Sequence, residues 1–261
     1  MTTWEAILLG IVQGLTEFLP ISSSGHLELS QHLLGFEALD RYIFFNLLCH
    51  LGTLGSILCV FAVEIKSSLR THRVRWLQVL CGTLPLFPLV LVLKPIKAVF
   101  DQPHSLGLCF LVTAALLFCS SKLRFNPSTS PHTRRWSDPL TIGLFQAVAI
   151  LPGISRSGAT ISAARMLGWS KPESTHFSFM LAIPAILGGI VLELWQLLKA
   201  SPASNVTIEP LPYLAAMLTS FVVGCVALKL LVRMVANDSW TYFAWYCLFL
   251  GSGTFIYFNL P

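Results

Sequence analysis

The chain has 261 residues, of which 54% are hydrophobic and only 11% are charged. A soluble domain usually has about 25% charged residues, so this composition excludes an ordinary soluble protein. The formal net charge of +5 does not indicate a nucleic-acid-binding protein, because the basic residues concentrate in two short loops.

Long apolar segments recur along the chain, and several approach the roughly 20 residues that cross a bilayer. The N-terminal segment MTTWEAILLG has no basic region and contains Glu5, so it does not resemble a cleaved signal peptide. The composition predicts an all-α polytopic membrane protein with about six transmembrane helices, forming a single integral membrane domain. The predicted spans are Tyr42–Ala62, Leu77–Leu93, the shorter Leu106–Cys119, Phe177–Leu198, Leu211–Val232 and Trp240–Phe258.

The basic loops predict the topology. By the positive-inside rule, loops rich in Lys and Arg are cytoplasmic, and the segment 77–120 between them becomes a hairpin with its turn, Asp101–His104, outside. Lys229 and Arg233 place the break before Trp240 inside as well. The two loops contain Lys66, Arg70, Arg73 and Arg75, and Lys122, Arg124, Arg134 and Arg135.

An internal repeat relates the two halves of the chain. A shift of 133 residues aligns the chain with itself without a gap and gives thirteen identities. The shift aligns Gly10 with Gly143 and Gln13 with Gln146, for example, and "LLGF" at 33–36 with "MLGW" at 166–169. We predict one repeat at about 1–66 and a second at about 137–199, with C-terminal helices at 211–258.

The repeats are predicted to be inverted. The span Tyr42–Ala62 runs toward the first inside loop, whereas Phe177–Leu198 runs away from the second, provided that Leu140–Lys171 is re-entrant. Each repeat also contains an apolar stretch too short to cross alone, one ending at Pro20 and the other at Pro152. Irregular backbone at membrane depth is tolerated where it is buried in protein or lines a wet cavity, so the two breaks should meet and form the site.

Polar residues gather at both breaks. Because an ionisable group costs about 2.5–3.5 kcal/mol in a bilayer on insertion scales, Glu17, His26 and Arg156 are expected to neutralise or ligate something. A buried Glu–Arg pair that only joins the repeats is the alternative. The first break offers Gln13, Glu17, Ser22, Ser23, Ser24 and His26, and the second offers Ser155, Arg156, Ser157, Gly158 and Thr160.

These residue types together suit phosphoryl transfer. Arginine presents a planar fork that matches phosphate oxygens, and serines flanked by glycines offer hydroxyl and N–H groups to anions. A serine beside a histidine is an activatable nucleophile, and Glu17 could ligate a divalent cation that bridges phosphates. No P-loop motif occurs in the sequence, so a nucleotide substrate is not expected.

The two motifs, "QGLTEFLPISSSGH" and "LPGISRSGAT", resemble the signatures of the undecaprenyl-diphosphate phosphatase family, the bacitracin-resistance proteins of bacterial membranes. The similarity extends along nearly the whole chain. It implies a multi-pass enzyme of the bacterial inner membrane that removes the terminal phosphate of undecaprenyl diphosphate and so recycles the lipid carrier for peptidoglycan synthesis. It also implies an inverted-repeat fold, a site opening to the outer face, and a divalent cation, Mg²⁺ or Ca²⁺; it leaves a homodimer open.

The resemblance also assigns roles to residues. Glu17 would be the metal or catalytic carboxylate, Ser23 the nucleophile, His26 the general acid/base and Arg156 the phosphate clamp, with a nucleophilic His26 as the alternative. Three positions depart from the family pattern: Gln13, Asn46 and Cys247. Substrate binding is assigned to Gln13, Ser22, Ser24, Gly25, Gly153, Ser155, Ser157, Gly158 and Thr160.

Two rival functions share some of these features. A lipid or anion transporter would use the same inverted repeat, but it would not need an activatable hydroxyl. A phosphatidic-acid-type phosphatase is disfavoured because it requires a downstream His followed closely by an Asp, and residues 157–175 contain neither.

Overall fold

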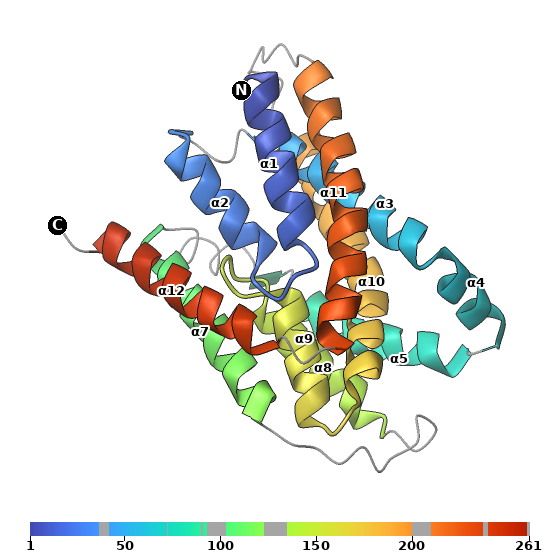
Figure 1. The fold of residues 1–261 in the computed structure, drawn as a ribbon. Helices are drawn as coiled ribbons and strands as arrows, with labels where there is room; N and C mark the ends of the chain where they lie inside the picture. Colours follow the sequence, from blue (N-terminus) through green and yellow to red (C-terminus); the bar gives the residue numbers. More distant parts are fainter. Residues whose placement is uncertain are drawn as a thin grey trace.

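The computed structural model describes residues 1–36, 42–71, 73–89, 91–92, 103–122, 135–199, 210–236 and 240–259. Within these residues the secondary structure is helical and contains no strand. Figure 1 shows the arrangement of the helices. They are α1 (Thr3–Thr16), α2 (Ser23–Leu33), α3 (Ile43–Val60), α4 (Ala62–Thr71), α5 (Arg73–Thr83), α7 (Pro103–Lys122), α8 (Ser137–Val148), α9 (Arg156–Met166), α10 (Lys171–Lys199), α11 (Pro210–Ala236) and α12 (Trp240–Asn259).

Four of the described helices are long and apolar enough to cross a membrane, which confirms a membrane protein as far as length and composition can. They are α3, α7, α10 and α11. The weakest predicted span, Leu106–Cys119, lies inside α7. The predicted span Trp240–Phe258 forms the 20-residue helix α12, which is not among the four.

The predicted span Leu77–Leu93 is not one continuous helix. Helix α5 ends at Thr83, and a turn at residues 84–85 follows. Pro85 and Pro88 explain the break, because proline has no N–H to donate and restricts the residue before it. Residues 90 and 93–102 lie outside the described residues, and so does the first half of the predicted turn at 101–104.

Close helix packing depends on small residues. Helix α1 lies along α11 (Figure 1), where a Cβ at Gly10 would be 2.8 Å from the carbonyl oxygen of Ala216 and one at Gly14 would be 2.8 Å from that of Ser220. The Ser220 hydroxyl also donates to the Gly10 carbonyl at 3.2 Å. Gly at spacing four lets helix backbones approach in this way in membranes. A second close pair is α7 with α12.

Helices α3 and α10 run in opposite directions. At one end Phe61, just after α3, contacts His176 near the start of α10, with ring centroids 6.0 Å apart. Earlier in α3 and later in α10, His50 lies 3.7 Å from Glu193. The start of α10 is also tied to the α4–α5 junction, because Arg75 pairs with Glu173 at 3.5 Å.

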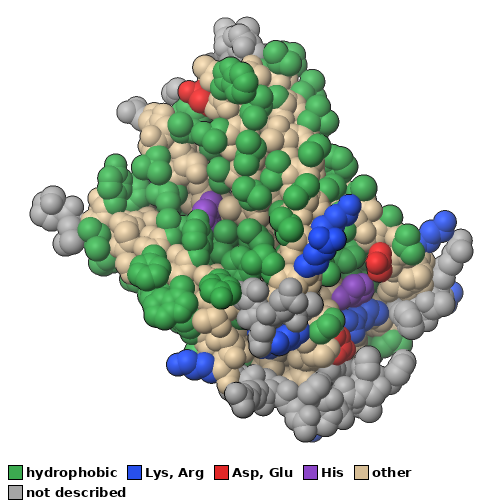
Figure 2. All heavy atoms as spheres, viewed as in Figure 1, with side chains coloured by type: hydrophobic (Ala, Val, Ile, Leu, Met, Phe, Trp, Pro, Cys, Tyr) green, Lys and Arg blue, Asp and Glu red, His purple; other side chains and the backbone are tan. Residues whose placement is uncertain are grey.

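The surface is apolar over most of the face in Figure 2, especially over α1 and α11, and Lys and Arg gather toward one end. On α11 the side chains of Leu218 and Val222 are 58% and 57% exposed. A soluble protein would not expose such a contiguous apolar face, so this surface suits contact with lipid. The basic loop positions Arg70, Arg124 and Arg134 lie among side chains that the structure does not describe.

Candidate active site

The two motifs fold into matching loop–helix units. Ser22 caps α2 by accepting the Gly25 N–H at 3.4 Å, and Ser155 caps α9 by accepting the Gly158 N–H at 3.0 Å. A serine hydroxyl at the N-cap satisfies an N–H group that the helix leaves unpaired. The capped helices have equal lengths of 11 residues.

The units also end alike. The Leu34 N–H donates to Ser30 and the Gly35 N–H to His32; 133 residues later, Leu167 donates to Ala163 and Gly168 to Arg165. Gly35 and Gly168 have φ values of 75° and 82°, a region that glycine adopts without steric cost and that commonly ends helices. The sequence repeat therefore coincides with a repeat of local hydrogen bonding.

Glu17 connects the two motifs. It follows the last turn of α1 and is 7% exposed. Its Oε1 accepts from Arg156 Nη2 at 2.9 Å, and its Oε2 accepts from Ser23 Oγ at 2.6 Å and from Gln13 Nε2 at 2.9 Å. Four residues that the sequence predicted to lie together thus share one carboxylate.

Two polar atoms at this carboxylate's edge have no hydrogen bond within the described residues. They are Arg156 Nη1 and Gln13 Oε1, both buried. A buried polar group without a partner is costly, so these two atoms would be satisfied by a ligand that offers an acceptor to Arg156 and a donor or a cation to Gln13. One atom is a cationic donor and the other is a neutral oxygen acceptor.

The motifs touch through their glycines. A Cβ placed on Gly25 would be 2.7 Å from Gly153 Cα and 2.8 Å from Gly153 N, so the two backbones are in direct contact. Gly153 itself has a φ of 91°, which side-chain-bearing residues rarely adopt. Ser157 Oγ adds a bond to the Leu19 carbonyl at 3.1 Å. The start of α2 therefore lies against the loop before α9, and the start of α9 lies against the loop before α2.

His26 is held apart from the carboxylate cluster. Its Nδ1 lies 2.6 Å from the Ser22 carbonyl oxygen, and its Nε2 lies 2.8 Å from the Tyr246 hydroxyl. Ser22 has a φ of 71°, the one positive value among the described non-glycine residues; such strain clusters at functional sites. Within the described residues His26 makes no hydrogen bond to Ser23 or Glu17.

The second motif has its own polar network. Ser155 Oγ lies 3.2 Å from Ser157 Oγ, and Thr160 Oγ1 lies 2.6 Å from Ser178 Oγ. Thr113 on α7 donates to the Gly153 carbonyl at 2.9 Å and accepts from the Ser155 N–H at 3.0 Å. Ser155, Ser157 and Thr160 are fully buried, so these hydroxyls hold the loop before α9 in shape.

The remaining residues singled out in the sequence are Ser24, Asn46 and Cys247, and they contact different parts of the structure. Ser24 lies at the start of α2 and is exposed, 3.4 Å from Ser22 Oγ. Asn46 accepts from Gln31 at 3.4 Å, away from the carboxylate cluster. Cys247 faces the first motif, with its Sγ 3.9 Å from the Pro20 carbonyl.

Sequence reasoning missed three contacting residues: Thr113, Ser178 and Tyr246. They come from α7, α10 and α12, outside both motifs. Of these three, only Tyr246 could have been suspected from the sequence, because it directly precedes Cys247, one of the positions that depart from the family pattern.

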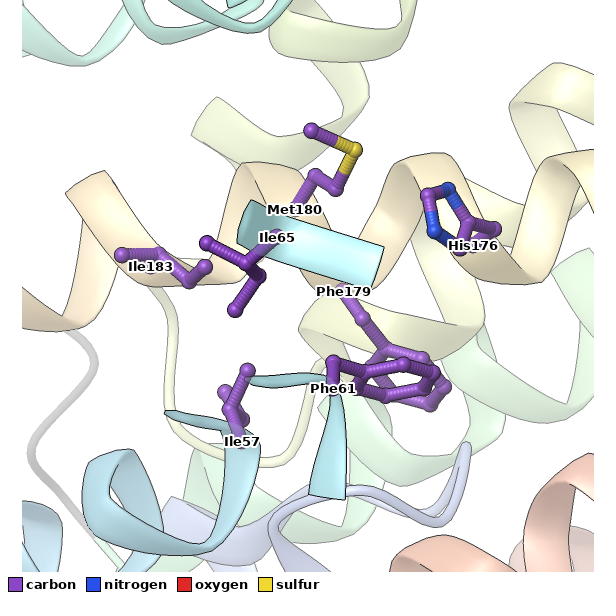
Figure 3. A pocket seen from close by; sticks show the side chains of 7 residues that line it. All are labelled: Ile57, Phe61, Ile65, His176, Phe179, Met180 and Ile183. Carbon is purple, nitrogen blue, oxygen red and sulfur yellow. The ribbon is translucent and has the colours of Figure 1, made fainter. Parts of the chain in front are cut away.

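A small cavity lies elsewhere, between α3, α4 and α10 (Figure 3). Its volume is about 10 Å³, room for roughly one water molecule. None of the predicted site residues lines it, and it is too small for a phosphate group. It is lined by Ile57, Phe61, Ile65, His176, Phe179, Met180 and Ile183.

Comparison with known proteins matches the sequence to a known family. The family described as "Bacitracin resistance protein BacA" matches residues 6–253. An undecaprenyl-diphosphatase of Protochlamydia amoebophila is 61% identical over 261 residues, covering 100% of both chains. Proteins of the same name from Rhodopirellula baltica and Alkaliphilus metalliredigens are 41% and 37% identical, covering at least 93% of each chain. The chain belongs to the bacitracin resistance protein family.

Proposed function

We propose that the protein is an undecaprenyl-diphosphatase, which hydrolyses undecaprenyl diphosphate to undecaprenyl phosphate and inorganic phosphate. The relatives named above support this activity, and nothing in the comparisons favours the transporter alternative. The observation that carries the proposal is the Glu17 carboxylate, which joins the Ser23 hydroxyl of one motif to the Arg156 guanidinium of the other.

We infer the following roles for the first step. Ser23 Oγ attacks the terminal phosphorus, and its proton passes to Glu17 Oε2, 2.6 Å away. The bond between that phosphorus and the bridging oxygen breaks, and undecaprenyl phosphate leaves with the electron pair. Water then hydrolyses the phosphoserine and releases inorganic phosphate. A hydroxyl beside a base is the usual arrangement of an activated nucleophile.

Phosphate would be bound by Arg156 and by the two helix starts. Arg156 Nη1 is buried without a hydrogen-bond partner among the described residues, so it can donate to a phosphate oxygen while Nη2 holds Glu17. The N-termini of α2 and α9 lie close together, each contacting the other's preceding loop. Helix N-termini favour anions through their free N–H groups and dipole.

A divalent cation, Mg²⁺ or Ca²⁺, fits this donor set. The described residues contain no cluster of three His, Cys, Asp or Glu side chains. Mg²⁺ does not require one, because it is usually held by one or two carboxylates plus substrate phosphates. Glu17 and the unpartnered Gln13 Oε1 would hold the ion. Bound there, it would neutralise charge on the diphosphate. Gln13 would thus provide a neutral oxygen where relatives often provide a second carboxylate.

We further propose an inverted-topology repeat with two re-entrant segments, α1–α2 and α8–α9. The matched caps of α2 and α9 and the antiparallel packing of α3 and α10 support it. Because α3 leads toward Lys66 and α10 leads away from Arg75, the basic end would be cytoplasmic. The family resemblance adds that the site would open to the outer face of the inner membrane.

Phosphate release by the purified protein tests the function. Wild type should release phosphate from undecaprenyl diphosphate, whereas Ser23→Ala and Arg156→Ala should lose nearly all turnover. A buried Glu–Arg pair that only joins the repeats predicts lower stability with turnover retained, so an active Arg156→Ala protein would contradict the assignment. Protein that moves lipid across vesicles without releasing phosphate would favour a transporter.

A further inference from the structure

Both ring nitrogens of His26 are engaged by protein groups. Nδ1 lies 2.6 Å from the Ser22 carbonyl oxygen, and Nε2 lies 2.8 Å from the Tyr246 hydroxyl. A backbone carbonyl can only accept a hydrogen bond, so the neutral imidazole has its proton on Nδ1. The Nε2 lone pair must then accept the hydrogen bond that Tyr246 donates.

The His26 ring is also fixed in orientation by aromatic neighbours. Tyr246 stacks on it with centroids 5.6 Å apart and planes 8° apart, and Phe110 meets it edge-on at 5.1 Å and 79°. Tyr246 belongs to α12 and Phe110 to α7, two helices that pack along each other. Two elements outside both motifs therefore set the direction in which Nε2 points.

We propose that Tyr246 is a positioning residue for His26 in the phosphatase reaction, a proposal that rests on the proposed function. In the neutral state the phenol donates to Nε2. When His26 is protonated, Nε2–H donates to the phenol oxygen instead, so the same contact serves both charge states that a general acid/base must adopt.

This contact also bears on the choice of nucleophile. In the structure the one lone pair with which His26 could attack phosphorus is occupied by Tyr246. Ser23, in contrast, already donates its proton to a carboxylate. The Tyr246 contact thus leaves the attack to Ser23.

The test compares Tyr246→Phe, which keeps the stacked ring and removes the hydroxyl, with Tyr242→Phe. Tyr242 lies one turn earlier on the same helix and is 75% exposed, so it controls for the loss of a phenol on α12. The measurements are kcat and KM for phosphate release, the thermal midpoint in detergent, and the ¹⁵N resonances of His26 in histidine-labelled protein.

General acid–base catalysis contributes about 10²- to 10⁴-fold, and losing its positioning alone should cost Tyr246→Phe about tenfold in kcat. KM and the thermal midpoint should stay near wild type, and the Nε2 resonance should move toward that of a free acceptor nitrogen. Tyr242→Phe should match wild type in every measurement.

An unchanged Nε2 resonance or an unchanged kcat in Tyr246→Phe would overturn the proposal, and so would an effect confined to KM or to the thermal midpoint. The experiment distinguishes failure of the Tyr246 proposal from failure of the proposed function. If wild type released no phosphate, the function would fail, yet the ¹⁵N comparison would still report whether Tyr246 binds His26.

Discussion

Replacing Gly25 with alanine should separate the two motifs. The added Cβ would lie 2.7 Å from Gly153 Cα, 2.8 Å from Gly153 N and 2.8 Å from Phe110 Cζ, whereas ordinary contacts begin at 3.4 Å. Two of these three atoms are backbone and cannot rotate away. The helix start carrying Ser23 and His26 must therefore move by about 0.7 Å relative to the second motif to restore normal contact.

That displacement gives the expected magnitude. Overpacking a close contact costs about 1–3 kcal/mol, and a misplacement of about 1 Å can lower turnover about 100-fold. We expect kcat of Gly25→Ala to fall about 10- to 100-fold, because the hydrogen bonds from Ser23 and Arg156 to the shared Glu17 carboxylate, at 2.6 and 2.9 Å, together connect the two segments that separate.

Gly189→Ala provides the matched control. Gly189 lies in α10, and a Cβ there would meet no atom within 4 Å, so this variant should retain wild-type turnover. Both variants and wild type would be compared by phosphate release at saturating substrate and by thermal unfolding in detergent. Wild-type kcat in Gly25→Ala would refute the direct contact between the motifs, and an equal loss in Gly189→Ala would show that the effect is not local.

Three further outcomes follow from the carboxylate cluster. Arg156→Lys should lower kcat/KM about 10- to 100-fold, since a charged hydrogen bond is worth about 1.5–3 kcal/mol and lysine cannot hold Glu17 and a phosphate with separate nitrogens; turnover near wild type would argue against the clamp. Chelation by EDTA should abolish phosphate release and Mg²⁺ or Ca²⁺ should restore it, whereas activity that persists in EDTA would remove the cation from the site. Glu17→Gln should lower the thermal midpoint because it leaves the Arg156 charge buried and unpaired, and Glu17→Gln/Arg156→Gln should recover part of the loss; a midpoint unchanged in Glu17→Gln would mean that the pair contributes no stability.

The sequence was most informative where local chemistry decides the structure. Ser22 and Ser155 cap helices because a serine followed by a glycine three residues later satisfies a free N–H at close quarters. The 133-residue shift aligns Ser22 with Ser155, and it aligns Gly35 with Gly168, which end the two helices. Neighbouring residues suffice to specify such features.

One predicted span is interrupted in the structure, and the reason is visible in the sequence. Residues 77–93 have the hydropathy of a span, but Pro85 and Pro88 interrupt the backbone hydrogen bonds that a helix requires. The described helix ends at Thr83. Hydropathy measures how strongly a side chain prefers lipid to water. The continuity of a helix depends instead on the backbone N–H groups, which proline lacks.

Contacts between distant elements could not be predicted in the same way. Tyr246 and His26 are 220 positions apart and Thr113 and Ser155 are 42 apart, and no periodicity relates either pair. These partners depend on how α7 and α12 pack beside the motifs, which single side chains do not determine. The sequence therefore predicted that Glu17 and Arg156 lie together but not which residues orient the groups around them.

The separation of His26 from Glu17 divides the proposed chemistry between two groups of side chains. If His26 were the base for Ser23, their side chains should be hydrogen-bonded, but Ser23 donates to Glu17 at 2.6 Å and His26 faces Tyr246 at 2.8 Å. A base must lie within about 3.2 Å of the proton that it removes, and Glu17 meets that requirement. Glu17 therefore suits activation of the nucleophile, with Arg156 beside it to hold phosphate, whereas both ring nitrogens of His26 are held by Ser22 and Tyr246.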